Sequence, residues 1–317
     1  QIVKCFRDED LRPNRQPEFT QLDLEASFID ESFIYELFEP LIQKVFAVVG
    51  KSIDAPFPHI TYEKAMNLYG NDHPDLRFDM TMVDVSSVLK DVQYRIFNSI
   101  LSNGGSIKGI NVKGKSSEMS KNMLQEELAK KVVPSFGGKG MSWMKVENGA
   151  LVSNIVQFFK PDEQQALIKA MNGEDGDVFL FVADTNKALV NDVLGRLRLY
   201  VGEKFGFIDN NKISPCWVTE FPMFELKDGK LSSMHHPFTQ PSDGIMEAKS
   251  TEDYLKLTSR AYDLVINGEE VGGGSIRIHD PKMQEKIFSA LGLSDDDIKS
   301  KFGFFVDALT YGTPPHG

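Results

Sequence analysis

The residues best suited to chemistry lie between Asp263 and Arg277, a segment with two carboxylates, three consecutive glycines and an arginine. Asn267 and Gly268 stand between two β-prone runs, which is the sequence of a two-residue type I′ hairpin. With that turn, Asp263 and Glu270 project from one face as diagonal neighbours about 6 to 8 Å apart. Two carboxylates at this separation suit a Mg²⁺ ion that is held together with substrate phosphates.

Arg277 follows Glu270 by seven positions, so an unbroken strand would carry its side chain to the opposite face. One extra residue, accommodated as a bulge within Gly272–Gly274, would return the arginine to the face of the carboxylates. We predict this bulge if Arg277 is functional. In the alternative interpretation, Asp263 and Glu270 are solvated surface charges and the glycines form a loop.

A second group of candidates lies near the start of the chain, where a charged loop begins at Arg7 between predicted strands over residues 1–6 and 19–28. The second strand alternates, so we expect one packed apolar face and one polar face. The apolar face comprises Leu22, Leu24 and Ala26, and the polar face comprises Phe19, Gln21, Asp23 and Glu25. Arg7 could clamp a phosphate or carboxylate, and Phe19 could stack on a planar base. A solvated charge run is the alternative.

His235 and His236 follow a predicted strand over residues 216–224 and precede a proline. Exposed histidines in such places are often incidental, but both remain candidates because other functional signals lie nearby.

Residues 109–116 match the GxxxxGK[ST] phosphate-loop pattern, and residues 178–184 imitate the apolar run ending in a metal-binding Asp. A phosphate loop follows directly on a buried strand, whereas residues 102–106 here predict a turn. The Ile-Asn-Val inside the motif also favours a strand. We interpret the match as chance, and keep a phosphate-loop ATPase that uses Lys115 as a second hypothesis.

The chain of 317 residues is long enough for about two domains. Its 41% hydrophobic and 26% charged residues exclude the disordered and fibrous classes, and a net charge of −11 argues against binding nucleic acid over the whole surface. Two distant cysteines support neither a disulfide framework nor a zinc site, and no apolar run approaches the length of a membrane span. The chain opens within a predicted strand, without Met or a targeting segment, so we expect a piece of a longer protein.

The remaining elements serve as scaffold. A helix with a buried apolar stripe is predicted from an Asp30 cap to Gly50, and a last helix begins at Ser294. The middle of the chain predicts an α+β module. Its helices are expected over residues 117–132, 161–171 and 186–204, and its strands over residues 141–147, 151–159 and 178–183.

Together these segments resemble class II aminoacyl-tRNA synthetases of the bacterial aspartyl type. Residues 6–25 closely resemble motif 2 of that family. The further similar segments, in the same order, are WVTEFPMF at 217–224, HHPF at 235–238, YDLVINGEEVGGGSIRIH at 262–279 and YGTPPH at 311–316. Residues 80–209 resemble the inserted GAD domain, so the likeness covers essentially the whole chain.

The resemblance implies an α+β fold, in which the antiparallel-sheet catalytic core of class II synthetases is interrupted by an inserted GAD-like domain. Residues 1–79 and 210–317 would form the core, and residues 80–209 the insertion. The family's anticodon-binding domain, motif 1 and motif 3 are expected outside these 317 residues. The core is therefore expected to be incomplete, and the chain nearly inactive by itself.

The resemblance also implies a reaction: ATP and Mg²⁺ activate L-aspartate to aspartyl-adenylate, which is transferred to the 3′ end of tRNA(Asp). It implies a cytoplasmic homodimer that meets tRNA mostly through regions outside this chain, with no membrane association. A non-catalytic paralogue that binds tRNA or a partner protein is the remaining alternative.

Roles carried over from the family fall on matching positions. ATP binding is implied for Arg7, Asp8, Glu9, Gln16, Phe19 and Glu270, and Arg7 is also the implied catalytic residue. Aspartate binding is implied for Arg7, Gln21, Asp23, His235, His236 and Arg277, and Mg²⁺ binding for Asp263 and Glu270. Arg277 would grip the side-chain carboxylate and reject asparagine, whose amide would leave the guanidinium poorly paired. The sequence does not choose between the two histidines.

Overall fold

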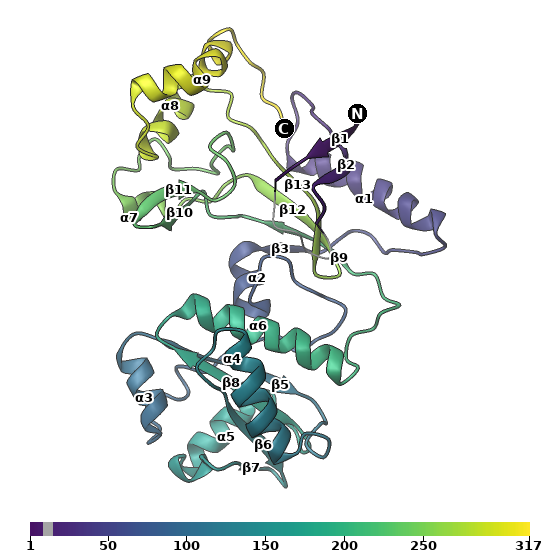
Figure 1. Ribbon diagram of the computed structural model, residues 1–317, viewed down its shortest axis with the longest axis vertical. Helices are drawn as coiled ribbons and strands as arrows, with labels where there is room; N and C mark the ends of the chain where they lie inside the picture. The colour runs from purple at the N-terminus through teal and green to yellow at the C-terminus, as the bar shows by residue number, and fades with distance from the viewer. Residues whose placement is uncertain (9–14) are drawn as a thin grey trace. The chain divides into compact units, whose positions relative to one another are not determined.

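The computed structural model describes residues 1–8 and 15–317 (Figure 1). The chain divides into two compact units, which are described separately. Unit 1 comprises Gln1–Lys44, Phe221–Tyr262 and Gly274–Gly317, and unit 2 comprises Val45–Glu220 and Asp263–Gly273. In the described part of the chain, no helix is both long and apolar enough to cross a membrane.

Unit 2 contains a five-stranded sheet with the order β4-β5-β8-β6-β7. Its strands are β4 (Val83–Asp84), β5 (Ser106–Val112), β6 (Ser142–Glu147), β7 (Ala150–Val152) and β8 (Val178–Asp184). Central strand β8 alternates between two cores, with Val178, Leu180 and Val182 in one and Phe179 and Phe181 in the other. The sheet is therefore covered on both faces, as a strand of continuous apolar residues requires.

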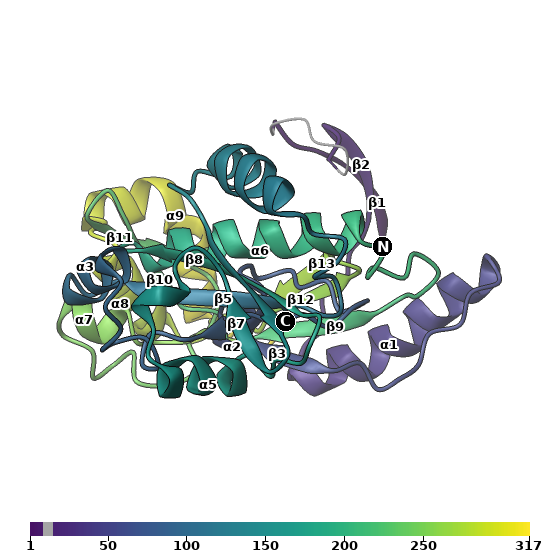
Figure 2. The same cartoon turned by 90° about the horizontal axis from the view of Figure 1, so that it is seen from below.

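Helices supply the two covers of this sheet. Helix α6 (Lys187–Lys204) and the π-helix η1 (Met123–Val132) pack on one face, and α3 (Arg95–Ser102) and α5 (Pro161–Ala170) pack on the other. Figure 2 shows α6 and α5 on opposite sides of the strands. Short α4 (Val133–Ser135) follows η1, and a 3-10 turn, η2 (Val156–Phe158), follows β7. Residues 80–209 thus have their own sheet and cores, while the predicted domain limits and the GAD assignment stay predictions.

A second sheet has the order β13-β12-β9-β3. Its strands are β3 (His59–Thr61), β9 (Pro215–Thr219), β12 (Ala261–Ile266) and β13 (Glu269–Ser275), and α2 (Tyr62–Tyr69) follows β3 directly. Strands β3 and β9 pair in parallel. The predicted hairpin is confirmed, because Asn267 and Gly268 alone separate β12 from β13 and have φ angles of 56° and 85°. Positive φ at both central residues defines a type I′ turn.

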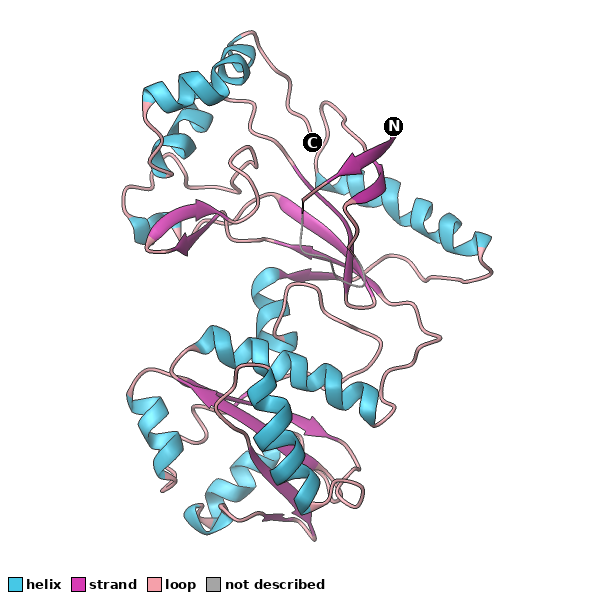
Figure 3. Cartoon of the chain, viewed as in Figure 1, coloured by secondary structure: helices cyan, strands magenta, loops and turns pink. Residues whose placement is uncertain are grey.

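Unit 1 contains two strand pairs and most of the remaining helices (Figure 3). The pairs are β1 (Ile2–Phe6) with β2 (Glu18–Leu22), and β10 (Phe224–Lys227) with β11 (Lys230–Ser233). The helices are α1 (Glu31–Val48), whose last turn lies in unit 2, α7 (Thr251–Tyr254), α8 (Pro281–Ala290) and α9 (Asp295–Thr310). A small core of Met223, Phe224, Ile245, Ile278 and Ile287 lies in this unit.

Several predicted elements are corrected. Strand β2 ends at Leu22 rather than at residue 28, β9 ends at Thr219 rather than at 224, and β7 ends at Val152 rather than at 159. Strand β5 begins four residues before the Ile-Asn-Val that favoured a strand, and helix α3 was not predicted. Glu220 explains the second correction, because its φ of 57° breaks the extended chain.

The apolar faces predicted for β2 and α1 are largely not packed. Leu22 is 51% exposed and Leu24 is 37% exposed, because a two-stranded ribbon has little surface against which to bury a face. Helix α1 has the predicted limits, but Ile34 is its one buried residue, and Val45 is 53% exposed. Alternation and helical spacing therefore identified the faces without showing what covers them.

The phosphate-loop hypothesis is wrong for this chain. Residues 109–112 belong to β5, and Gly109 pairs with Phe181 on β8, so these backbone amides face a sheet partner rather than a phosphate. A Cβ on Gly109 would lie 2.6 Å from the Phe181 ring, which explains this glycine by packing. Asp184, the supposed metal ligand, forms an ion pair of 2.7 Å with Lys139.

Gly70→Ala should destabilise unit 2 strongly. Gly70 has φ +84°, and a Cβ there would lie 2.2 Å from the carbonyl oxygen of Asn191 on α6. We expect the free energy of unfolding in urea to fall by about 3 kcal/mol or more. Gly50→Ala is the control, because Gly50 has φ +71° with nothing within 4 Å, and it should lose only about 1 to 2 kcal/mol. Equal losses in the two variants would contradict the close approach of α2 and α6.

Candidate functional site

Arg7, Phe19 and Gln21 lie on one face of the β1–β2 ribbon. Cys5 pairs with Phe19, and the amide of Arg7 donates to the carbonyl of Pro17 at 2.9 Å, so Arg7 is the diagonal neighbour of Phe19. The guanidinium of Arg7 lies 5.3 Å from the centroid of the Phe19 ring. Cys5 Sγ donates to Gln21 Oε1 at 3.3 Å on the same face. The ribbon therefore presents a cation, an aromatic ring and an amide together.

The other motif 2 candidates are distributed around this face. Gln1 pairs its amino terminus with the carbonyl of Asp23 at 2.8 Å, which continues the ribbon and keeps Asp23 on the face of Phe19. Asp8 and Gln16 are exposed. Glu9 lies outside the described residues.

Arg277 lies in a separate group of polar side chains within unit 1. Its Nη1 donates to Ser275 Oγ at 2.9 Å and makes a very short contact with His236 Nε2. Thr239 forms a β-bridge with Arg277, and its Oγ1 lies 3.3 Å from His236 Nδ1. We call Ser275, His236 and Thr239 the arginine cradle. Sequence analysis missed both Ser275, a hydroxyl two residues before Arg277, and Thr239, which approaches Arg277 through the pairing of distant segments.

The backbone at Arg277 connects the cradle to the chain that follows the ribbon. Arg277 N donates to the carbonyl of His316 at 2.9 Å, and His316 forms a β-bridge with Ser27. Ser27 lies four residues beyond Asp23. The YGTPPH segment therefore lies between the continuation of β2 and the strand-like segment of Arg277, which gives this motif a structural role.

The two histidines have different environments. His236 is half-buried against Arg277, whereas His235 is exposed, with its ring 4.6 Å from that of Phe221 in an edge-to-face contact. Burial, with the nearby charges of Arg277 and His235, lowers the pKa of His236 from 6.5 to about 4. His236 is therefore neutral near pH 7, so it can accept a hydrogen bond from Arg277.

Helix α1 contacts Arg260 and the start of β12, the strand that pairs with β13. Arg260 forms a bidentate ion pair with Glu31, at 2.8 and 2.5 Å, and the rings of Tyr35 and Tyr262 meet edge to face at 5.7 Å. Burial raises the pKa of Tyr262 to about 12, although the charge of Arg277 opposes that rise. The phenol therefore stays protonated beside the guanidinium.

The hairpin carboxylates belong to unit 2. The two-residue turn puts Glu270 opposite Val265, and so places Glu270 and Asp263 diagonally on one face. Asp263 is half-buried and Glu270 is exposed, while a Cβ on Gly272 would meet nothing within 4 Å. Within residues 1–8 and 15–317, no group of three or more His, Cys, Asp or Glu side chains could hold a metal. A carboxylate pair fits Mg²⁺ that takes its other ligands from water and phosphate.

The predicted bulge has the expected effect on pairing. Strand β13 has seven residues against six in β12, and Ile276 N donates to the carbonyl of Arg260 at 3.0 Å. The turn alone would put Ser275 opposite Arg260, so β13 contains one extra residue. Gly274 is part of this region, where a Cβ would lie 2.8 Å from the hydroxyl of Tyr262.

Comparisons with known proteins identify the family of the chain. Residues 1–317 match the family of tRNA synthetases class II (D, K and N). The chain belongs to this family.

Its relatives include named aspartate ligases. The chain is 56% identical over 318 residues to "Aspartate--tRNA(Asp/Asn) ligase 1" of Syntrophus aciditrophicus, with 100% of this chain and 44% of that protein covered. It is 44% identical over 320 residues to "Aspartate--tRNA ligase" of Halalkalibacterium halodurans, with 100% and 53% covered. The chain thus spans about half the length of these relatives. A putative aspartyl-tRNA synthetase from Leishmania major Friedlin aligns over 38% of this chain and 18% of that chain, at 21% identity and a TM-score of 0.23, too low to support an argument.

His236 should make the stability of the chain depend on pH. The unfolded chain protonates this ring near pH 6.5, whereas the folded chain does so only near pH 4. Protonation thus favours the unfolded state, and this part of the stability is complete above pH 6.5 and lost as the pH falls towards 4. Urea unfolding at pH 7 and pH 5 should show a smaller loss in His236→Gln than in the unchanged chain.

The matched control for this experiment is His235→Gln, which changes the exposed neighbour. It should keep the full loss of stability between the two pH values. A loss in His236→Gln equal to that of the unchanged chain would show that His236 is not the responsible group.

Proposed function

We propose that this chain forms part of the catalytic core of an aspartate–tRNA ligase. The α-carboxylate of L-aspartate would attack the α-phosphorus of ATP, forming aspartyl-adenylate and releasing pyrophosphate. The aspartyl group would then pass to the 3′ end of tRNA(Asp), releasing AMP. The names of the relatives and membership of the class II family support this proposal.

The observation that carries the proposal is the setting of Arg277. The partners of its guanidinium, Ser275 Oγ and the imidazole of His236, are neutral groups. A substrate carboxylate would add charge-assisted hydrogen bonds to this cation, and such bonds are stronger than those between neutral groups. The amide of asparagine would lose that advantage and bring an N–H group against a donor. Arg277 is therefore suited to select aspartate.

The β1–β2 ribbon is suited to the nucleotide. Phe19 would stack on adenine, and Arg7 would hold the α-phosphate and the reacting carboxylate where negative charge develops, with little covalent chemistry by the protein. Asp8, Glu9 and Gln16 would contact ATP. Gln21 and Asp23 would hold aspartate, with Asp23 pairing with the substrate ammonium.

Asp263 and Glu270 would hold Mg²⁺ beside the phosphates, and the ion would supply positive charge to the pyrophosphate leaving group. Either His235 or His236 would close over aspartate. We further propose a cytoplasmic homodimer, a GAD-like identity for residues 80–209, and tRNA contacts that lie mostly outside this chain.

Arg277→Ala should impair the use of aspartate. In a protein with these residues and the full length of the relatives, aspartate-dependent ATP–pyrophosphate exchange should lose about 10³-fold in kcat/KM, mainly through KM. The preference for aspartate over asparagine should fall as well. Arg196→Ala, which removes an exposed arginine paired with Asp192, is the control and should keep normal exchange. Normal aspartate kinetics in Arg277→Ala would show that Arg277 does not bind the side-chain carboxylate of aspartate.

Arg7→Ala should reduce kcat for the same exchange by about 10² to 10³-fold, because it removes the positive charge that stabilises the negative charge of the transition state. Lys115→Ala tests the rejected phosphate-loop hypothesis and should leave exchange within about twofold of normal. Normal exchange in Arg7→Ala together with loss of exchange in Lys115→Ala would restore the phosphate-loop hypothesis. Tight tRNA binding without exchange in the unchanged protein would instead indicate a non-catalytic paralogue.

A further inference from the structure

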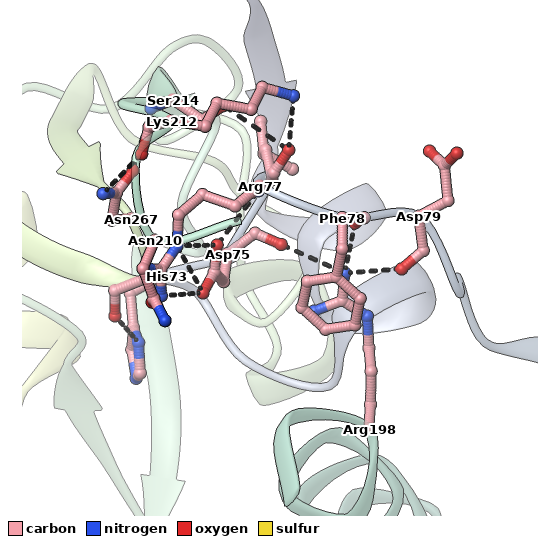
Figure 4. A network of polar contacts seen from close by, with 12 residues as sticks. His73, Asp75, Arg77, Phe78, Asp79, Arg198, Asn210, Lys212, Ser214 and Asn267 are labelled. Atoms are coloured by element: carbon pink, nitrogen blue, oxygen red, sulfur yellow. Dashed lines mark hydrogen bonds and ion pairs between the residues drawn. The ribbon is translucent and has the colours of Figure 1, made fainter. Parts of the chain in front are cut away.

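A polar network in unit 2 involves residues outside those assigned to ATP and aspartate (Figure 4). It joins the segment between α2 and β4 to the β12–β13 turn and to helix α6. We call it the turn clamp, and its members are His73, Asp75, Arg77, Arg198, Asn267 and Gly268.

Asp75 and Arg77 form the centre of the clamp. The Asp75 side chain is 3% exposed, and its carboxylate accepts from Arg77 Nε at 3.0 Å and Nη2 at 2.6 Å. Burial alone would raise the pKa of Asp75, but the hydrogen bonds and charge of Arg77 outweigh burial and lower it. Arg77 Nη1 also donates to Asn210 Oδ1 at 3.2 Å. The pair is therefore an ionised, nearly buried bridge.

The hairpin turn rests directly on Asp75. A Cβ on Gly268 would lie 3.2 Å from the Cβ of Asp75, so the turn backbone and this side chain are in close contact. His73 Nδ1 lies 2.7 Å from the carbonyl oxygen of Gly268, which it can reach as a donor. The side chain of Asn267 accepts from Ser214 N at 2.8 Å and donates to the carbonyl of Lys212 at 3.1 Å. Both turn residues are thus held from outside the hairpin.

Arg198 fixes the segment on which the turn rests. Its guanidinium donates to four carbonyl oxygens, at 2.9 to 3.2 Å, and is 1% exposed. The acceptors are the carbonyls of Asp75, Phe78, Asp79 and Met80. The Phe78 ring lies 3.9 Å from the guanidinium. Burial lowers the pKa of Arg198 to about 10, so it remains charged near pH 7.

The carbonyls converge on Arg198 only while residues 75–80 keep this shape. Loss of the arginine would leave several buried acceptors without donors, which is costly. Met80 has φ 80°, an unfavourable value for a residue with a Cβ, and its carbonyl accepts from Arg198 Nε. The shape of the segment therefore depends on a side chain of helix α6.

The hairpin needs such support at its turn. Strand β13 is at the edge of its sheet, and Glu269 to Gly273 are exposed. An edge strand is hydrogen-bonded along one side only, so β13 depends on β12 and on the turn for its position. Glu270 lies two residues beyond Gly268, so movement of the turn would change its distance from Asp263.

We propose that Asp75, Arg77 and Arg198 are positioning residues for the carboxylate pair Asp263 and Glu270, and that they act by clamping the Asn267–Gly268 turn. This inference rests on the proposed function, in which that pair holds a divalent cation with ATP. It makes helix α6, which packs on the five-stranded sheet, a determinant of the metal site.

Arg77→Gln and Asn267→Gly test the clamp in two ways. The first breaks the ion pair with Asp75. The second keeps a residue that tolerates positive φ but removes the side-chain bonds to the loop of Ser214. Hydrogen exchange of the 317-residue chain without metal should be about tenfold faster at the backbone amide of residue 267 in both variants, because this amide donates to the Ser214 carbonyl.

The same variants should alter the metal dependence of a protein that has these residues and the full length of the relatives. The Mg²⁺ concentration for half-maximal ATP–pyrophosphate exchange should rise by about tenfold, while KM for aspartate stays within about twofold. Asn267→Asp keeps the acceptor for Ser214 N, so its Mg²⁺ requirement should stay close to that of the unchanged protein. Arg196→Gln, which breaks a surface ion pair on α6, is the matched control and should change neither readout.

Asp263→Asn separates failure of this inference from failure of the proposed function. If Asp263→Asn leaves the Mg²⁺ dependence unchanged, the metal role of the hairpin is wrong. If Asp263→Asn raises the Mg²⁺ requirement but Arg77→Gln and Asn267→Gly do not, the clamp is not a positioning device. A lower melting temperature with unchanged Mg²⁺ dependence in these two variants would likewise overturn the inference.

Discussion

The left-handed turn at Asn267 and Gly268 is the constraint on which the candidate metal pair depends. Two successive residues with positive φ fix the pairing of β12 with β13, and that pairing determines which side chains share a face. The turn is also seated on Asp75 rather than left in solvent. Local backbone chemistry thus sets the register of the hairpin, and tertiary contacts set its position.

Two arginines illustrate opposite uses of a partly or fully buried cation. Arg198 is surrounded by carbonyl oxygens and aromatic rings, so its hydrogen-bonding capacity is used by the fold. Arg277 is half-buried against a hydroxyl and a neutral imidazole, so its charge meets no compensating charge in these contacts. The first arrangement stabilises a segment, whereas the second is receptive to an anion. In the sequence, both arginines simply stand between two aliphatic residues, so this difference is not visible there.

The features that sequence analysis predicted are those set by nearby residues. The type I′ turn, the extra residue in β13, the limits of α1 and the strand inside the phosphate-loop pattern all follow from local chemistry. The arginine cradle and the turn clamp could not be predicted, because Arg277 meets His236 and Arg198 meets the carbonyl of Asp75 across long stretches of chain. Leu22 shows a related limit of sequence analysis. The alternation of the strand identified its apolar face, but whether that face is buried depends on which other element packs against it.

The extra residue in β13 has a consequence for how this protein can change over evolution. It is the number of residues between Glu270 and Arg277, more than their identity, that decides the side on which the arginine emerges. A codon lost from the Gly272–Gly274 run would reverse that side at once, whereas replacement of the open Gly272 would not. Selection on this stretch should therefore tolerate some substitutions while rejecting single-residue insertions and deletions.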